Sequence, residues 1–198
     1  MKKIILIISA ALLFNGCYIV NRLGGTYYRF TQSEYRYHSL ENIQLAGISL
    51  GNASSISVSK LASIATVLAG GSTLQNIPFS MTLNMDVTNP NKSAAFLEAL
   101  DYAIRVNEME FVEGKMDTLI HIEAGETKVV PIPISVDLKK VINRYTQQRV
   151  TSEMSAFLGI TPNEISVTME LWPKFTVGNT LIKSPAVIPV TFNLGGDN

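Results

Sequence analysis

Few side chains in this sequence have the types and spacings that catalytic chemistry or metal binding requires. Asp86 alternates with Asn84 and Thr88 along a predicted strand, and one carboxylate with amide and hydroxyl neighbours is a poor calcium site. We therefore expect Asp86 to be a solvated strand residue. Glu98 and Asp101 are close in the sequence, but nothing there places a second catalytic group beside them. The carboxylates provide no catalytic candidate.

The other residue types used in catalysis and metal binding are equally sparse. The chain holds two histidines, His38 and His121, and one cysteine, Cys17, so neither an internal disulfide nor a zinc cluster is expected. His121 lies between Ile120 and Ile122 in an alternating segment, and we predict an exposed strand histidine. The sequence contains no G-x-S-x-G, no H-E-x-x-H and no glycine-rich phosphate loop. We predict a non-enzymatic protein without a cofactor or a bound metal.

Cys17 is the one residue whose context indicates covalent chemistry. The chain begins with two lysines and an apolar run that is shorter than the roughly 20 residues needed to span a bilayer. Residues 1–16 are therefore predicted to be a signal peptide. The letters LFNGC at Leu13–Cys17 resemble a bacterial lipobox of the relaxed kind found in Bacteroidetes lipoproteins. That resemblance implies acyl chains such as palmitate on Cys17; the alternative is an ordinary signal peptide with an incidental cysteine.

A lipidated Cys17 would set where the protein is located. Two or three acyl chains hold a protein stably on a membrane, whereas one chain gives only marginal binding. Tyr18–Arg22 contains no acidic run, and in Bacteroidetes lipoproteins an acidic stretch at this place resembles a surface-export tag. We therefore expect an anchor in the outer membrane that faces the periplasm of a bacterial envelope. Residues 17–39 are predicted to be a tether, with an aromatic and basic collar at the membrane interface as the alternative for Leu23–Ser39.

The clearest structural signal is the stretch Ile77–Asn91. Its apolar and polar residues alternate strictly, which is typical of a strand with one buried and one solvated face. The predicted buried side holds Phe79, Met81, Leu83, Met85 and Val87. Asn89-Pro90-Asn91 then ends the strand, because Pro90 cannot donate to a ladder and asparagine side chains can make turn hydrogen bonds.

Shorter alternating segments predict further strands. A first strand with a kink near Gly47 is expected within Leu40–Leu50. Others are expected at residues 100–106, 108–114, 120–122, 128–136, 165–171 and 188–194.

Prolines mark two of these strands. Pro131 and Pro133 lack N–H groups on the same side, so Lys128–Val136 is predicted to be an edge strand. Trp172-Pro173 is expected to end the strand that begins at residue 165, which leaves Val177–Pro185 as a connecting loop.

Two segments change to a helical period. Apolar residues recur three and four apart in Ser57–Ala69, and Gly70-Gly71 supplies a stop. This very apolar helix must cover another part of the fold. Asp137–Leu158 is predicted to be a second helix, with Asp137 as its N-cap and Gly159 at its end.

The bulk composition limits the possible partners. The formal net charge is zero, and without the two signal-peptide lysines the mature chain is slightly acidic. This balance gives no basic footprint for nucleic acid. The chain length allows one sizeable domain, which we place at residues 40–198.

Four features in order resemble one known family. They are NPN at Asn89–Asn91, LDYAIRV in the next strand, FVEGK after a turn, and then AGETKVVPIPISVDL. Together they cover about Ile77–Leu138 and resemble the group 2 late embryogenesis abundant domain, also called the water stress and hypersensitive response domain. The resemblance implies a seven-stranded, immunoglobulin/fibronectin III-like β-sandwich, no established catalytic residues, and a role in stress protection such as desiccation tolerance. Val106-Asn107-Glu108 departs from the family, since many members carry a glycine in this turn.

These observations predict a mainly β fold, an immunoglobulin/fibronectin III-like β-sandwich with two added helices. Two function classes remain open. In the first, the protein is a lipid-anchored envelope module that contacts partner proteins or other envelope material and protects against stress. In the second, it is a periplasmic carrier or sensor of an apolar ligand such as a lipid, held between the Ser57–Ala69 helix and the sandwich. A carrier needs an internal cavity of roughly 300 Å³ or more.

Overall fold

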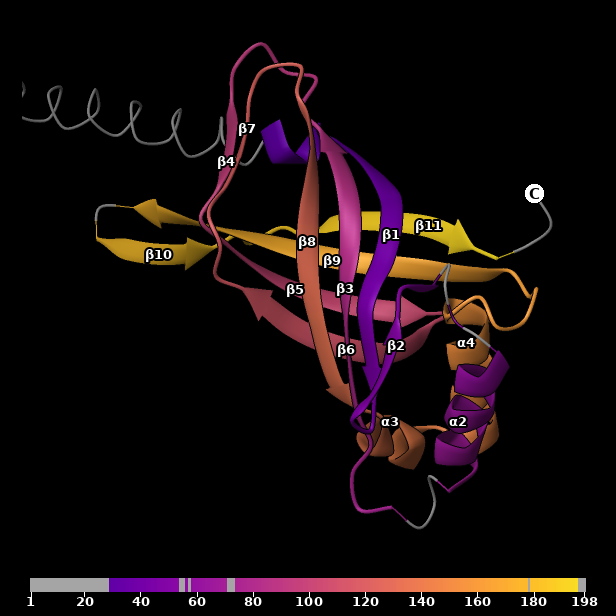
Figure 1. The fold of residues 1–198 in the computed structure, drawn as a ribbon. Helices are drawn as coiled ribbons and strands as arrows, with labels where there is room; N and C mark the ends of the chain where they lie inside the picture. Colours follow the sequence, from indigo (N-terminus) through magenta and orange to yellow (C-terminus); the bar gives the residue numbers. More distant parts are fainter. Residues whose placement is uncertain (1–28, 54–55, 57, 71–73, 178, 196–198) are drawn as a thin grey trace, which may run out of the picture.

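The computed structural model describes residues 29–53, 56, 58–70, 74–177 and 179–195. The fold is mainly β and contains several antiparallel sheets (Figure 1). The predicted signal peptide, Cys17 and the tether as far as Tyr28 lie outside the described residues.

The first sheet has four strands in the order β2-β1-β3-β8. Their bounds are Ile48–Gly51 for β2, Glu34–Leu45 for β1, Pro78–Thr88 for β3 and Thr127–Asp137 for β8. The predicted strand at Ile77–Asn91 is confirmed as β3, and its predicted inward side chains are buried. β8 lies at the edge of the sheet, as its prolines predicted.

The second sheet has the order β10-β9-β5-β6, and β11 also pairs with β9. The bounds are Thr180–Lys183 for β10, Ile165–Val177 for β9, Ala99–Val106 for β5, Met109–Met116 for β6 and Ile188–Leu194 for β11. β4, Ala95–Leu97, and β7, Ile120–Ile122, form a separate two-stranded ribbon.

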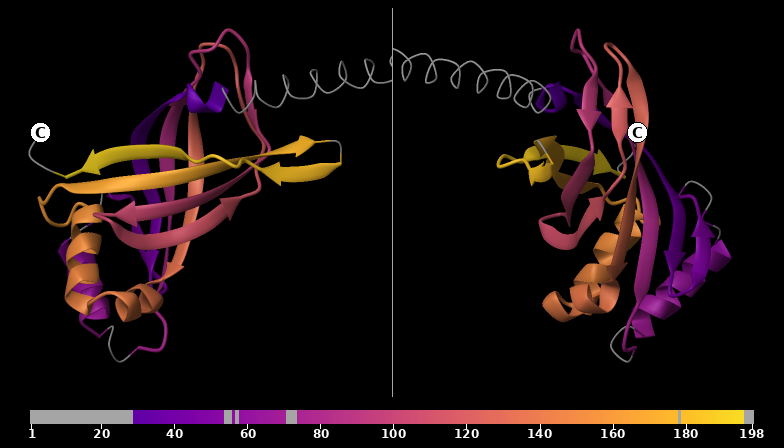
Figure 2. Two further views of the ribbon diagram at one scale, coloured as in Figure 1. Left: turned by 180° about the vertical axis from the view of Figure 1, so that it is seen from behind. Right: turned by 90° about the vertical axis from the view of Figure 1, so that its left-hand side faces the viewer.

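The two larger sheets form two layers with the hydrophobic core between them (Figure 2). Side chains from both sheets belong to one continuous cluster of buried residues. Phe79 of β3 meets Phe111 of β6 with 5.9 Å between ring centres. Between the sheets, the hydroxyl of Tyr102 in β5 donates to the carbonyl of Pro133 in the edge strand β8.

Three helices lie at one end of the sheets (Figure 1). The predicted helix at Ser57–Ala69 is confirmed as α2, Val58–Ala69, and it lies beside α4, Gln147–Phe157. The predicted single helix at Asp137–Leu158 was wrong, because it is divided into α3, Leu138–Arg144, and α4.

The division between α3 and α4 has a local cause. The hydroxyl of Thr146 accepts a hydrogen bond from the Arg149 N–H at 3.2 Å and thus caps a new helix. Asp137 is confirmed as the N-cap of α3, and Gly159 follows α4 with a φ of 69°. Within the described residues, the second of the two expected helices is thus two helices, α3 and α4.

The predicted start of the domain at Leu40 was too late. Glu34–Ser39 belong to β1 and pair with β3. Two of the aromatic residues assigned to a tether or membrane collar pack on the domain: Phe30 is buried, and the Tyr37 ring stacks on Phe192 at 5.7 Å. Burial also raises the pKa of the Tyr35 hydroxyl.

Three other predictions need correction. The kink expected near Gly47 is a two-residue hairpin turn between β1 and β2, with positive φ at Ala46 and Gly47. Trp172-Pro173 does not end its strand, and the expected loop at Val177–Pro185 contains β10. The described residues form eleven strands where the family resemblance implied seven.

Candidate functional site

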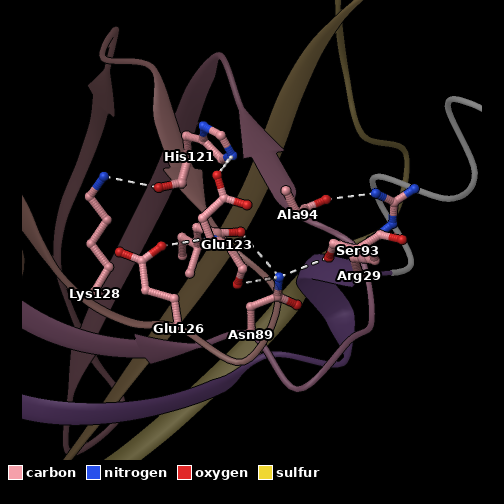
Figure 3. Close-up of polar contacts among 9 residues, drawn as sticks. Arg29, Asn89, Ser93, Ala94, His121, Glu123, Glu126 and Lys128 are labelled. Carbon is pink, nitrogen blue, oxygen red and sulfur yellow. Dashed lines mark hydrogen bonds and ion pairs between the residues drawn. The ribbon is translucent and has the colours of Figure 1, made fainter.

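The loop that follows β3 is held by one buried side chain, that of Asn89. Asn89 has no exposed surface, and its Nδ2 donates to the carbonyls of Ser93 at 3.0 Å, Ile122 at 3.1 Å and Glu123 at 3.0 Å (Figure 3). Its main chain also pairs with the Gly125–Glu126 turn. The predicted turn is confirmed. In addition, Asn89 joins the end of β3 to the turn between β7 and β8.

The first described residues are fixed at this same end of the molecule. Arg29 Nη1 donates to the carbonyl of Ala94 at 2.6 Å (Figure 3), and Asn91 Nδ2 donates to the carbonyl of Arg29 at 3.2 Å. Phe30 inserts into the core. The polypeptide therefore enters the domain beside the loop that Asn89 holds.

His121 lies on the β4–β7 ribbon of this end and is half-exposed, as predicted. Its ring stacks on Phe96 with 4.5 Å between ring centres, and its Nε2 lies 3.2 Å from the Glu123 carboxylate. Leu119 beside it is 66% exposed. Lys128 Nζ donates to the main-chain carbonyl of His121 at 2.9 Å rather than to its ring. This arrangement orients the imidazole but gives it no nucleophile to activate.

Asp86 is on the solvated face of β3, as predicted, and it has a partner that the sequence did not indicate. His38 Nδ1 of β1 lies 3.1 Å from the Asp86 carboxylate. Asn84, which alternation placed on the same polar face, is buried instead, and its Nδ2 donates to the hydroxyl of Ser39 at 2.9 Å. Asn84 and Asp86 therefore do not form a joint site.

Glu98 and Asp101 have different partners in the structure and do not form a common site. Glu98 accepts a hydrogen bond from the Thr176 hydroxyl. Asp101 forms ion pairs with Lys174 and, at 3.2 Å, with Lys183. Burial alone would raise the pKa of Asp101, but the two ammonium groups outweigh it and hold that pKa below its usual value. A carboxylate held ionised between two lysines is a structural group rather than a general acid.

Two absences among the described residues bear on the predicted sites. Within the described ranges, no group of three or more histidine, cysteine, aspartate or glutamate side chains could hold a metal ion. In the part of the chain that the structure describes, none of the helices has the length and apolarity to cross a membrane. Cys17 lies outside the described residues, so its lipidation stays a prediction.

The interior between the sheets is almost completely filled. Tyr35, Met85, Leu100 and Met169 are among the apolar residues that line a cavity of about 30 Å³ there. At the junction of the helices with the sheets, the Phe157 ring of α4 lies 5.9 Å from that of Phe111. Side chains of α4 and β6 therefore meet at this part of the junction, whereas the ligand site that we considered lay between α2 and the sheets. The predicted core positions of Met81, Met85 and Met169 are confirmed.

A recess lies on the outer face of the five-stranded sheet and extends past β6 to β8 and α3. We call it the outer groove, and its volume is about 550 Å³. Residues from β5, β6, β8, β9 and α3 line it, including Ala103, Arg105, Glu113, Glu170, Trp172 and Lys140. The helices lie at the end of the sheets rather than over this face (Figure 2). The sequence did not indicate this site, because Trp172 was expected at the end of its strand.

Comparison with known proteins decides the family. A family model described as late embryogenesis abundant protein matches residues 84–191, which is more than half of the chain. The chain belongs to the late embryogenesis abundant family. The resemblance expected from the four ordered features is confirmed, and the family match continues past Leu138 into β11. The loop of Asn89 and the outer groove both lie within the matched region of this late embryogenesis abundant domain.

Solved structures of low similarity accompany this match. A protein from Archaeoglobus fulgidus is 7% identical with a TM-score of 0.35, over 82% of this chain and 99% of that one. An Arabidopsis thaliana protein is 12% identical with a TM-score of 0.36, over 61% of this chain and 70% of its own. A late embryogenesis abundant protein solved in solution is 12% identical with a TM-score of 0.36, over 98% of this chain and 87% of its own. None of the curated proteins matches this chain. The family assignment rests on the family model.

Proposed function

We propose that this late embryogenesis abundant protein is a non-enzymatic, lipid-anchored module of the bacterial cell envelope that acts through its surface, as an interaction or stress-protective module. The observation that carries the proposal is the filled interior. A cavity of about 30 Å³ is roughly a tenth of the smallest volume typical of a ligand pocket. Because this cavity, among the described residues, has no room for a lipid, we infer that the sheet faces and loops are the parts available for function.

The alternative, a carrier or sensor of an apolar ligand, requires a space between helix and sheet. α2 buries Ile64 and Leu68, and Gln147 of α4 donates to the carbonyls of Leu68 and Ala69 at 2.7 and 2.9 Å. Hydrogen bonds at the last carbonyls of α2 attach it to α4. Opening this junction would cost both these bonds and the packing of Phe157 on Phe111. The surface function is therefore the better supported of the two.

The proposed anchor also fits where the chain enters the domain. The segment from Cys17 to Arg29 can span at most about 40 Å when fully extended. Arg29 is held at the end of the molecule that carries the Asn89 loop and the β4–β7 ribbon. In the proposed arrangement this end faces the bilayer, residues 1–16 are removed as a signal peptide, and the domain lies on the periplasmic side of the outer membrane.

The same proposal includes the finer fold assignment. We propose that the two facing sheets are an immunoglobulin/fibronectin III-like sandwich to which the helices and the β4–β7 ribbon are added. The pairing of β3 between β1 and β8, and of β5 between β9 and β6, supports a two-sheet arrangement of this kind.

The anchor is tested by replacing Cys17 with Ala in the full-length chain. Cells are fed an alkyne analogue of palmitate, the protein is probed for the label, and membrane and soluble fractions are compared. We expect Cys17→Ala to lose the label and move to the soluble fraction, while Arg29→Ala, which leaves the lipobox intact, stays labelled and membrane-bound. A Cys17→Ala protein that remained in membranes after a high-salt wash would contradict the proposed anchor.

A further inference from the structure

The outer groove has the dimensions of a site for an elongated ligand. Its volume of about 550 Å³ is within the range of roughly 300–1,000 Å³ that is typical of ligand pockets. A neighbouring hollow of about 460 Å³ shares Arg105 and continues to Ser166 and Thr168. From Ser166 to Trp172, β9 runs for about 20 Å. The two hollows adjoin at Arg105 and follow β5 and β9, and we call the two together the track.

Two apolar side chains, Ala103 and Trp172, shape this partly polar track. Ala103 is in register with Glu113 of β6 and Glu170 of β9, so a small side chain lies between two longer ones and leaves the recess open. Trp172, the single tryptophan of the chain, lines the groove and is half-buried. Its ring is held from the β10 side by Lys183, whose Nζ lies 4.5 Å from the ring centre. The indole is therefore a positioned flat surface in the groove.

The charges around the groove compensate each other. Arg105 Nη1 lies 2.9 Å from the Glu170 carboxylate, and Arg144 Nη1 lies 2.7 Å from that of Glu110. A ligand with net charge would meet attraction and repulsion together and gain little from this surface. The same paired groups still carry unused guanidinium hydrogens and carboxylate lone pairs. Such groups suit a partner that offers many neutral donors and acceptors.

We propose that the outer groove binds a neutral oligosaccharide chain. A sugar has an apolar C–H face that can stack on Trp172 and hydroxyl groups that can both accept from Arg105 and donate to Glu170. The length of the track fits several linked rings rather than one. This proposal rests on the proposed function, since it names a chemical class of partner for a domain that acts through its surface.

The single tryptophan makes the proposal directly measurable. Full-length protein in lauryldimethylamine oxide micelles, which contain no sugar headgroup, is titrated with maltohexaose, cellohexaose and N-acetylchitohexaose while tryptophan fluorescence is recorded. We expect a saturable change in intensity or emission wavelength with at least one of these probes, and no saturable change with the anionic probe dextran sulfate. Absence of saturation for all three neutral probes up to about 10 mM, a concentration beyond which affinity is too weak to be specific, would overturn the proposal.

Variants locate the binding in the groove. Ala103→Gln puts a larger side chain into the recess at a solvent-facing position. We expect at least a tenfold weaker affinity by calorimetry with an unchanged melting temperature. The matched control is Val129→Gln, an exposed strand residue of β8 in the other sheet, which should leave affinity unchanged. Trp172→Leu should abolish binding and Trp172→Phe should retain part of it. Equal affinity of Ala103→Gln and wild type would overturn the assignment. None of these results depends on Cys17, so loss of sugar binding and loss of anchoring are distinguishable.

Discussion

The buried side-chain amide of Asn89 donates a hydrogen bond to the main-chain carbonyl of Ile122 over 3.1 Å and so joins the end of β3 to β7. The same Nδ2 also donates to the carbonyls of Ser93 and Glu123, while the Asn89 Oδ1 accepts from Asn91 Nδ2 at 2.8 Å. A buried polar side chain is tolerated only when its hydrogen bonds are made, and those of Asn89 are. One asparagine thereby holds the loops at the end where the chain enters the domain.

Asn89→Ala should destabilise the protein strongly. The substitution leaves the carbonyls of Ser93, Ile122 and Glu123 without this donor, and each buried unsatisfied group costs about 1–3 kcal/mol. We expect a loss of about 2–4 kcal/mol in the free energy of unfolding, measured by urea denaturation. Asn193→Ala, which removes an exposed hydrogen bond to Glu164, is the control and should change stability by less than about 0.5 kcal/mol. Similar effects for the two variants would contradict the role given to Asn89.

Gly114→Ala should also destabilise, for a steric reason. Gly114 of β6 is in register with Tyr102 of β5, and a Cβ at Gly114 would overlap the Tyr102 ring. The ring cannot move freely, because its hydroxyl donates to the Pro133 carbonyl. We expect a loss of about 1–3 kcal/mol by thermal denaturation. Gly70→Ala, where a Cβ would meet open space, is the matched control and should be nearly neutral. An unchanged melting temperature for Gly114→Ala would contradict this packing.

The β5–β6 turn offers a stabilising substitution. Asn107 and Glu108 both have positive φ, 45° and 65°, and the family pattern places a glycine in this turn. A left-handed conformation costs a non-glycine residue about 1–2 kcal/mol, so Glu108→Gly should raise the free energy of unfolding by about 0.5–1 kcal/mol.

Asn107→Gly is the informative comparison for that turn. Asn107 Oδ1 accepts from the Ser166 N–H at 2.9 Å, and its Nδ2 donates to Glu153 at 2.7 Å. Removing these bonds should lower stability although the backbone strain is relieved. A melting temperature that rose by the same amount in both variants would show that the Asn107 side chain is dispensable.

Asp101 should make stability depend on pH in the acid range. Its pKa in the folded protein is lowered, because Lys174 and Lys183 together outweigh the effect of burial. A carboxyl group with a lowered folded-state pKa stabilises above its unfolded value of about 3.9, and that contribution is lost as the pH falls through the folded value. We expect Asp101→Asn to lose about 1 kcal/mol at neutral pH.

The pH series supplies the check on that interpretation. The stability difference between wild type and Asp101→Asn should shrink as the pH falls below about 4. Glu34→Gln, which removes an exposed ion pair with Arg36, should show no comparable dependence. A difference that stayed constant down to pH 2, well below the usual aspartate range of about 3.9, would contradict the ion-pair account of Asp101.

Strict alternation predicted the long strands well, because a period of two decides which face is buried. β3, β5, β8 and β11 all lie where that period placed them. The pattern failed where a local interaction overrides periodicity. Thr146 divides one predicted helix into two by capping the second, and Ala46-Gly47 turns the chain where a kink was expected.

Pro173 shows why a single residue type can mislead. It was taken as a strand end, yet β9 continues through it to Val177. Along the same edge of β9, the pairing with β11 ends at Leu171 of β9, and the pairing with β10 begins at Lys174 of β9. Pro173 therefore lies between two ladders, where a missing N–H removes no ladder hydrogen bond. The partner strand that makes this possible was not recognisable from the local sequence.

The candidate sites were less predictable than the strands because their residues are distant in sequence. The turn role of Asn89 followed from its neighbours, but its bonds to Ile122 and Glu123 join segments more than thirty residues apart. The outer groove combines β5, β6, β8, β9 and α3, and its floor depends on the register of Ala103 with Glu113 and Glu170. Registers of this kind are a property of the folded sheet.

The central claim is that the protein acts through its surface and holds no ligand in its interior. It is tested most directly by native mass spectrometry of the gently purified full-length protein and of Cys17→Ala, each followed by solvent extraction. We predict that Cys17→Ala has the mass of the polypeptide alone, that the wild type carries additional mass only as covalent acyl groups, and that neither releases an extractable lipid. A defined lipid that co-purifies in stoichiometric amount with Cys17→Ala and is recovered by extraction would contradict the claim and favour the carrier.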